Sequence, residues 1–278
     1  MKVGVIGAGT MGSGIAQAFA QAGYEVMLSD IKMEFAEGGK NKIKKNLDRA
    51  VSKGKMEQAA ADEMLSRIIP CGNDDLGDCD LIEEAALENT KIKQDTFKAM
   101  DKLCKKDCIF ASNTSSLSVT EIGNVIDRPL IGMHFFNPAP VMKLIEVIPG
   151  INTPQDVTDR VVAISKEIGK TPVVVQEGPG FVVNRILVPM INEAVGIYAD
   201  GLASPEDIDT AMKLGANHPM GPLALGDLVG WDIALAVMDT LYREFQDPKY
   251  RAHPYIRKMV RGRRLGIKTG RGFYDYSK

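Results

Sequence analysis

Three glycines near the start of the chain constrain its fold more than any other feature. Gly7, Gly9 and Gly12 form the sequence GAGTMG. This sequence follows an apolar, β-branched run at residues 2–7 and opens an amphipathic helical stretch, after which residues 24–30 read as a second strand. Glycine at these positions permits a tight turn, close approach of a ligand to the backbone, and close helix packing. The pattern therefore predicts a βαβ unit whose helix N-terminus binds the pyrophosphate of a dinucleotide; the alternative is a purely structural glycine turn.

Asp30 decides which dinucleotide is expected. It stands at the end of the second predicted strand, where a carboxylate can accept hydrogen bonds from the adenosine ribose and would repel the 2′-phosphate of NADP. Asp30 therefore favours NAD. Lys32, two residues further on, could offset that repulsion, or could be a solvated side chain at the start of a helix.

The rest of the chain indicates two domains. Short apolar runs alternate with helical stretches, which favours a doubly wound sheet. These runs cover residues 81–84, 108–112, 130–135, 144–148 and 172–176. A breaker sequence, Glu-Gly-Pro-Gly, follows at residues 177–180, and beyond it the predicted elements are helices at residues 181–199, 205–214, 223–245 and 253–260. We predict an α/β chain in which a Rossmann-like domain, residues 1–178, precedes an all-helical domain, residues 179–278.

Composition limits the partners. With 34 basic and 36 acidic residues the formal charge is −2, so there is no global electrostatic reason to bind nucleic acid or an anionic membrane. No apolar run in the sequence approaches the ~20 residues that span a bilayer. The first predicted strand begins at residue 2, and we expect a soluble, cytoplasmic protein. The cysteines, neither CxxC-paired nor spaced as zinc ligands, are expected to be free thiols, with no metal site.

His134 is the candidate proton acceptor among only three histidines. It lies at the end of a predicted strand, on the edge of a doubly wound sheet where ligands bind. Asn-Pro-Ala-Pro at residues 137–140 turns the chain, and the strand that follows brings Glu146 opposite His134. Paired with this carboxylate, the imidazole would have the fixed tautomer of an oriented general base. His218 and His253 are typical of capping or surface residues.

The sequence leaves a second interpretation of this pair open, in which His134 is a satisfied core residue and Glu146 faces solvent from an edge strand. The segment Ser-Asn-Thr-Ser-Ser at residues 112–116 is equally ambiguous. It follows a predicted strand, so its side chains could bind the substrate oxygen or the nicotinamide. Serine and threonine ahead of a short helix are also common N-caps.

Over essentially its whole length the chain resembles the 3-hydroxyacyl-CoA dehydrogenase family, most closely its short bacterial 3-hydroxybutyryl-CoA dehydrogenases. The resemblance rests on GAGTMGSGIAQAFA, ASNTSSLS, GMHFFNPAPVMKLIEVI, GPGFVVNRI, DIDTAMKLGANHPMGPLALGD and the terminal GRGFYDY. HFFNP followed by PGFVVNR is a highly specific combination. The resemblance implies reversible hydride transfer between NAD and C3 of a short acyl-CoA with an (S)-3-hydroxyl. It also implies that the helical domain binds substrate and forms a homodimer.

The resemblance also implies residue roles. His134 would be the general base towards the 3-hydroxyl, with Glu146 as its orienting carboxylate. Ser115 would hydrogen-bond the reacting oxygen, and Asn137 and Asn184 would help to hold substrate and histidine. The implied cofactor-binding residues are Gly7, Gly9, Gly12, Asp30, Glu88, Lys93 and Asn113, the last three at the nicotinamide half.

Two further expectations concern charged residues. On sequence alone, Glu88 and Lys93 read as a solvated helix start. Basic side chains recur at three- and four-residue steps along one predicted helix, a pattern that is usually only a solvated face. They are Lys42, Lys45, Arg49 and Lys53. In relatives the corresponding region meets the CoA phosphates, which makes Lys53 and Lys55 the expected contacts.

Two residues depart from the family pattern. Glu83 stands where relatives usually carry an apolar residue, and a carboxylate in a central strand is costly if it is buried without a partner. Arg264 replaces what is often an aromatic or apolar residue, which puts the packing of the tail in doubt.

Two other functions remain compatible with the fold: dinucleotide binding without turnover, and dehydrogenation of free 3-hydroxy acids. The intact set of His134, Glu146, Ser115 and Asn184 argues against the first, and the HFFNP segment argues against the second.

Overall fold

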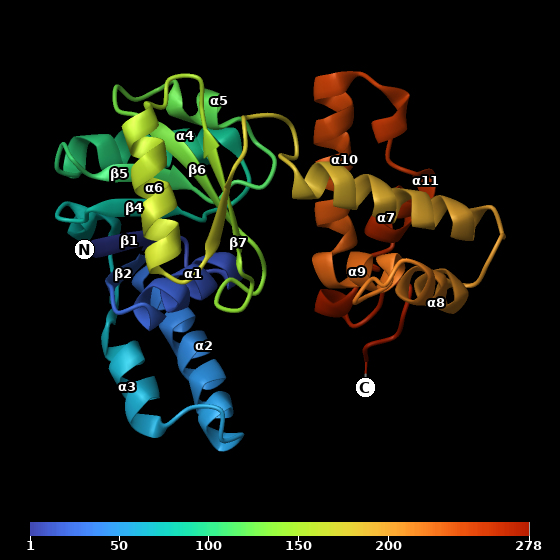
Figure 1. Cartoon of the computed structure of the whole chain (residues 1–278), viewed down its shortest axis with the longest axis horizontal. Coiled ribbons are helices and arrows are strands. Elements are labelled where there is room, and N and C mark those ends of the chain that lie inside the picture. The colour runs from blue at the N-terminus through green and yellow to red at the C-terminus, as the bar shows by residue number, and fades with distance from the viewer. Residues whose placement is uncertain (278) are drawn as a thin grey trace. The chain divides into compact units, whose positions relative to one another are not determined.

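The computed structural model describes residues 1–277, and the chain divides into two compact units, Met1–Gly178 and Pro179–Lys278 (Figure 1). Within the described part of the first unit, eight strands form one sheet in the order β3-β2-β1-β4-β5-β6-β7-β8. The strands are β1 (Lys2–Ile6), β2 (Glu25–Ser29), β3 (Ile68–Cys71), β4 (Leu81–Glu84), β5 (Ile109–Ser112), β6 (Leu130–Phe135), β7 (Leu144–Pro149) and β8 (Thr171–Val174). Neighbouring strands run parallel except for β6 and β7, which are antiparallel. The predicted Rossmann-like fold class is confirmed.

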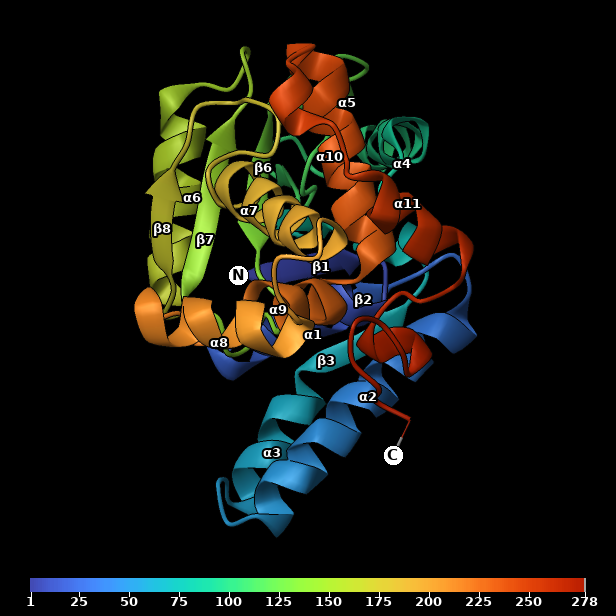
Figure 2. The ribbon, with the colours of Figure 1, turned by 90° about the vertical axis from the view of Figure 1, so that its right-hand side faces the viewer.

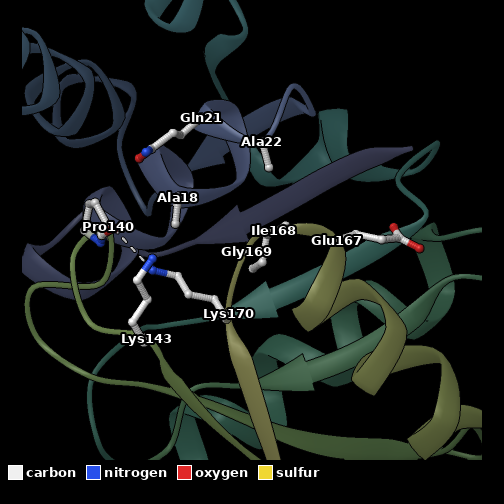
Figure 3. A pocket seen from close by; sticks show the side chains of 9 residues that line it. All are labelled: Ala18, Gln21, Ala22, Pro140, Lys143, Glu167, Ile168, Gly169 and Lys170. Atoms are coloured by element: carbon white, nitrogen blue, oxygen red, sulfur yellow. Dashed lines mark hydrogen bonds between the residues drawn. The ribbon is translucent and has the colours of Figure 1, made fainter. Parts of the chain in front are cut away.

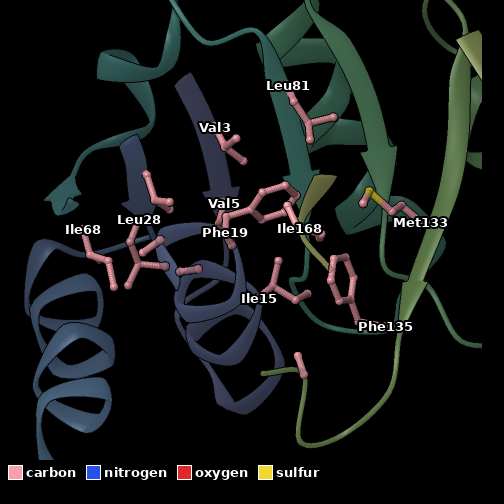
Figure 4. Packing of buried hydrophobic residues seen from close by; sticks show 14 of the residues in the cluster. Val3, Val5, Ile15, Phe19, Leu28, Ile68, Leu81, Met133, Phe135 and Ile168 are labelled. Atoms are coloured by element: carbon pink, nitrogen blue, oxygen red, sulfur yellow. The ribbon is translucent and has the colours of Figure 1, made fainter. Parts of the chain in front are cut away.

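Helices cover both faces of this sheet. They are α1 (Thr10–Gln21), α2 (Met33–Ser52), α3 (Gln58–Ser66), α4 (Thr90–Leu103), α5 (Val119–Gly123) and α6 (Gln155–Glu167). On the first face, Ile15 and Phe19 of α1 pack into one buried apolar cluster with Val5 of β1 and Met133 of β6 (Figure 4). Burying each such side chain contributes roughly 1.5–3 kcal/mol.

The second face of the sheet is covered by α4 and α5. The ring of Phe97 on α4 lies 5.5 Å from that of Phe110 on β5. A Cβ on Gly132 of β6 would lie 3.1 Å from Cγ2 of Val119 on α5. Successive side chains of a strand alternate between faces, so the side chain of His134 lies on the same face as Gly132. This is the face that carries the candidate site.

The second unit is helical, and one of its helices differs from the prediction. Its helices are α7 (Val183–Ala199), α8 (Pro205–Gly215), α9 (Pro222–Val229), α10 (Trp231–Phe245) and α11 (Pro254–Arg261) (Figure 2). The single helix expected at residues 223–245 is wrong: Gly230, with a φ of 100°, separates α9 from α10. The break lets the indole of Trp231 pack onto Gly226, where a Cβ would lie 2.4 Å from the ring.

Asp227 of α9 anchors the C-terminal tail of this unit. Its carboxylate accepts hydrogen bonds from the indole of Trp231 (2.6 Å) and from the backbone N–H groups of Phe273 and Tyr274 (2.9 Å each). Arg264 donates to the carbonyl of Gly272 in the same tail (2.7 Å), so the tail does pack against the residue that departs from the family pattern. Within residues 1–277, no helix is both long and apolar enough to cross a membrane.

Candidate active site

The glycine turn lies between β1 and α1. Gly7 has a φ of +98°, in the left-handed region that favours glycine, and a Cβ on Gly12 would lie 1.6 Å from the Gly7 carbonyl oxygen. A Cβ on Gly9 would meet no atom of the described residues within 4 Å. Packing of the chain itself therefore explains Gly7 and Gly12 but not Gly9. The open space at Gly9 fits a backbone that a pyrophosphate approaches closely.

Asp30 follows β2 and is anchored beside this turn. Its two carboxylate oxygens accept hydrogen bonds from the N–H of Ala8 (2.6 Å) and of Ile31 (2.7 Å). These bonds fix the carboxylate at the carboxyl edge of the sheet, where it can also accept a bond from a ribose hydroxyl. Lys32, which precedes α2, is exposed.

Glu84 and Lys93 form a buried ion pair behind this edge. The Lys93 ammonium donates to both carboxylate oxygens of Glu84, at 2.8 and 2.9 Å, and Ser112 Oγ donates to Glu84 at 2.6 Å. Lys93 is 1% exposed, so the solvated helix start that the sequence alone suggested is wrong for this residue. The sequence analysis did not identify Glu84 as a site residue, because its partners come from other elements, α4 and β5. A charged residue at the end of a short strand between two other predicted strands was the available signal, since a buried charge needs a partner.

Glu88 organises the turn that contains Ser115. Its Oε1 accepts hydrogen bonds from Thr114 Oγ1 (2.7 Å), Ser115 N (2.8 Å), Ser115 Oγ (3.1 Å) and Ser116 N (3.1 Å), and its Oε2 lies 3.4 Å from Lys93 Nζ. Burial raises the pKa of Glu88, but the Lys93 ammonium and the donors from Thr114 and Ser115 outweigh it, so the pKa lies below its ordinary value. Glu88 is therefore an anion that links the buried pair to the serine turn.

His134 and Glu146 face each other across the β6–β7 hairpin. The strand register pairs the two residues, and His134 Nδ1 lies 2.8 Å from Glu146 Oε2. Their exposed fractions are 5% and 1%, so the predicted pairing is confirmed and a solvent-facing glutamate is excluded. Asn113, after β5, accepts a hydrogen bond from Phe135 N at 2.7 Å and so ties β5 to the end of the strand that carries His134.

The other predicted site residues are more exposed than this pair. Asn137 is exposed in the loop after β6. Lys53 and Lys55 are exposed in the turn between α2 and α3, which projects away from the sheet (Figure 1). Asn184 is half-buried in the first turn of α7, in the second unit.

A glycine turn at the carboxyl edge of a parallel sheet, with an imidazole–carboxylate pair on the same edge, is typical of dinucleotide-dependent dehydrogenases. Comparison with known proteins narrows this class. The NAD-binding domain of 3-hydroxyacyl-CoA dehydrogenase matches residues 2–178, and the C-terminal domain of the same enzyme matches residues 180–276. The chain belongs to the 3-hydroxyacyl-CoA dehydrogenase family and is an NAD-dependent dehydrogenase.

Individual relatives match over the full length. The chain is 58% identical to a 3-hydroxybutyryl-CoA dehydrogenase of Clostridioides difficile, covering 100% of both sequences. It is 44% identical to the human mitochondrial hydroxyacyl-coenzyme A dehydrogenase over 99% of this chain and 90% of the human one. The crystal structure of (S)-3-hydroxybutyryl-CoA dehydrogenase from Ralstonia eutropha, 50% identical, matches with a TM-score of 0.93 over 100% of this chain and 99% of that one.

Proposed function

We propose that this chain catalyses the reversible, NAD-dependent oxidation of (S)-3-hydroxybutyryl-CoA and other short-chain 3-hydroxyacyl-CoA thioesters. His134 is the general base in oxidation and the general acid in reduction. The observation that carries the proposal is the buried bond of 2.8 Å between His134 Nδ1 and Glu146 Oε2. A buried carboxylate holds an imidazole in one orientation and stabilises the imidazolium that forms when it accepts a proton. The activities for which the Clostridioides and Ralstonia relatives are named support the choice of substrate.

Each residue has a distinct role in this proposal. With Nδ1 bonded to Glu146, Nε2 of His134 is the atom we assign to the proton of the 3-hydroxyl. Ser115 hydrogen-bonds the reacting oxygen from the turn that Glu88 organises. We assign to Asn137 and Asn184 the role of holding substrate and histidine.

The cofactor fits the residues of the first unit. Gly7 and Gly12 allow the tight turn, Gly9 leaves the backbone at the start of α1 accessible to a pyrophosphate, and Asp30 is anchored beside this turn. Glu88, Lys93 and Asn113 would line the nicotinamide half. When bound, NAD supplies the acceptor for the hydride that leaves C3 of the substrate.

The remaining assignments concern the rest of the molecule. We assign NAD binding to residues 1–178, and substrate binding and dimerisation to residues 179–278. Lys53 and Lys55 would contact the phosphates of CoA. A homodimer and a cytoplasmic location complete the proposal.

A spectrophotometric assay tests the proposal directly. Oxidation of NADH is followed at a fixed enzyme concentration with acetoacetyl-CoA, longer 3-ketoacyl-CoA thioesters and free acetoacetate. We expect turnover with acetoacetyl-CoA and much slower turnover with the free acid. NADPH in place of NADH tests the role of Asp30, because its carboxylate should disfavour the 2′-phosphate. Faster turnover of free acetoacetate than of its CoA ester would contradict the proposed substrate class.

A further inference from the structure

Lys170 is a buried cation in the first unit whose hydrogen-bond partners are backbone carbonyls. It lies between α6 and β8, directly after Gly169, which has a φ of +73°. Its exposed fraction is 8%. The ammonium donates to the carbonyl oxygens of Ala139 (2.7 Å), Pro140 (3.3 Å) and Met142 (2.8 Å). Figure 3 shows its side chain extending towards Pro140.

An ammonium group has three N–H donors, and three carbonyls receive them here. Hydrogen bonds from a charged donor are stronger than neutral ones, above all where water is excluded. Burial lowers the pKa of Lys170, and the neighbouring charge of Lys143 lowers it further. Burying a charged group is costly unless it is hydrogen-bonded, so the three carbonyls offset the burial of this ammonium.

The three carbonyls belong to the loop that joins β6 to β7, and this loop separates His134 from Glu146 in sequence. The loop also has internal bonds, because the N–H groups of Val141 and Met142 both donate to the Pro138 carbonyl, at 2.9 and 3.0 Å. Lys170 adds a connection to a different part of the sheet, between α6 and β8. The loop is thereby bonded to Lys170 at three positions between Ala139 and Met142.

Helix α1 holds the same loop from another direction. Ala139 is buried, and a Cβ on Gly14 of α1 would lie 3.3 Å from Ala139 Cβ and 3.4 Å from Pro140 Cδ. The loop therefore contacts both the Lys170 ammonium and the helix that begins at the glycine turn, which we propose to bind pyrophosphate. A loop held at both places keeps Asn137 and the end of β6 in a fixed position relative to that helix.

We propose that Lys170 is a positioning residue for the reaction: by binding three carbonyls of the β6–β7 loop, it fixes Asn137 and the His134–Glu146 pair in the geometry needed for proton transfer. This inference rests on the proposed function. Lys170 acts through the loop and does not touch the reacting atoms. Misplacement of a catalytic group by about 1 Å can cost on the order of 100-fold in rate, so a modest shift of the loop would be measurable.

The test replaces Lys170 with methionine, which keeps an unbranched apolar stem and removes the charge and the donors. We expect kcat for acetoacetyl-CoA reduction to fall about 10- to 100-fold, while the dissociation constant of NADH changes less than about twofold because the glycine turn is untouched. Amide hydrogen exchange of a peptide covering residues 136–143 should accelerate. Lys143→Met is the matched control, because Lys143 is an exposed lysine that lines the same hollow of about 280 Å³. It should leave kcat and exchange unchanged.

The outcomes separate this inference from the proposed function. If the wild type turns over acetoacetyl-CoA and Lys170→Met keeps its kcat and the slow exchange of the loop, the positioning role is refuted. A lower melting temperature with unchanged kcat would also refute it, since Lys170 would then serve only the fold. Lys170→Gln retains two donors without the charge, so it should lose less activity than the methionine variant. If the methionine variant does not fold, the same measurements are made on Lys170→Gln. An inactive wild type would overturn the proposed function. Faster loop exchange in Lys170→Met would still support the inference that Lys170 holds the β6–β7 loop in place.

Discussion

Two neighbouring carboxylates in β4 have opposite environments. Glu84 faces the side of the sheet that carries α4, where it accepts hydrogen bonds from Lys93, Ser112 and the N–H of Ala86. Glu83 faces the other side, and among residues 1–277 neither of its buried carboxyl oxygens has a hydrogen-bond partner. Both residues are completely buried. The difference between them comes from strand alternation, which sends consecutive side chains to opposite faces.

The comparison shows that burial alone does not decide the state of a carboxyl group. Glu83 pairs in register with Val5 on one side and Ala111 on the other, in the apolar cluster under α1. Burial raises its pKa well above the ordinary value, the charge of Glu84 adds to the rise, and Lys93 opposes it. The apolar surroundings of Glu83 therefore favour its neutral form. Glu84, bonded to a buried lysine, belongs to a network that reaches the serine turn, and the same face carries His134.

The largest expected effect lies on the network face of the sheet, at His134. His134→Gln keeps a polar side chain but removes the proton acceptor, so kcat should fall roughly 10²- to 10⁴-fold, the usual range for a general base. NADH affinity should change little. Steady-state kinetics together with fluorescence titration of NADH check both. The control is His218→Gln, a substitution in the second unit that should leave kcat unchanged. A loss of less than tenfold at His134 would remove it from the catalytic role.

Lys93→Met should produce the next largest effect, on stability. It leaves the buried Glu84 carboxylate without its cation, and breaking a buried pair from one side costs about 3–5 kcal/mol of unfolding free energy. Urea denaturation at neutral pH measures this. Lys91→Met is the control: its side chain is 74% exposed beside Asp95, and an exposed pair contributes at most about 1 kcal/mol. Equal losses in the two variants would show that the Glu84 environment is no different from a solvated surface.

Glu83 should give a smaller effect that depends on pH. Its folded pKa lies above the unfolded value, so the folded state holds a proton that the unfolded state releases. The stabilising contribution is fully present below the unfolded pKa and is lost as pH rises towards the folded pKa. One such group makes the unfolding free energy decline by up to about 1.4 kcal/mol per pH unit in this window.

Glu83→Gln removes this titration with little change in shape. Between pH 5 and 7, we expect the stability of the wild type to decline more steeply, or to rise less, than that of the variant, as measured by urea denaturation at each pH. Glu63→Gln, at a carboxylate that is 66% exposed, is the control and should leave the pH dependence unchanged. Parallel curves for the wild type and Glu83→Gln would mean that Glu83 is ionised in the folded protein.

The sequence predicted those parts of the fold and site that depend on local pattern. The glycine turn and the pairing of His134 with Glu146 follow from short-range signals: glycine spacing, and the length of a turn between two strands. β3 was missed because it has four residues, contains Pro70 and pairs with only one neighbouring strand. The break at Gly230 was missed because apolar periodicity continues across it.

Side-chain contacts between different elements were not predictable in the same way. The Glu84–Lys93 pair joins a strand to the following helix, and the bonds of Lys170 reach a loop about thirty residues earlier. Periodicity describes which face of an element is apolar, but it does not indicate which charged residue from another element faces it. A lysine is usually solvated, so nothing in the sequence marked Lys93 or Lys170 as buried.

The smallest expected effect concerns two exposed lysines, in contrast to the buried Lys93. Lys53 and Lys55 lie at the exposed turn between α2 and α3. Exposed charges are screened by water and salt, so replacing both with glutamine should raise the KM for acetoacetyl-CoA only about two- to tenfold. kcat should remain unchanged, because these residues would contact the CoA phosphates and not the reacting atoms. The dependence of KM on salt should also weaken. The matched control is Lys42→Gln/Lys45→Gln, at two exposed lysines on the preceding helix α2. An equal rise in KM in this control would assign the effect to the general positive charge of the region.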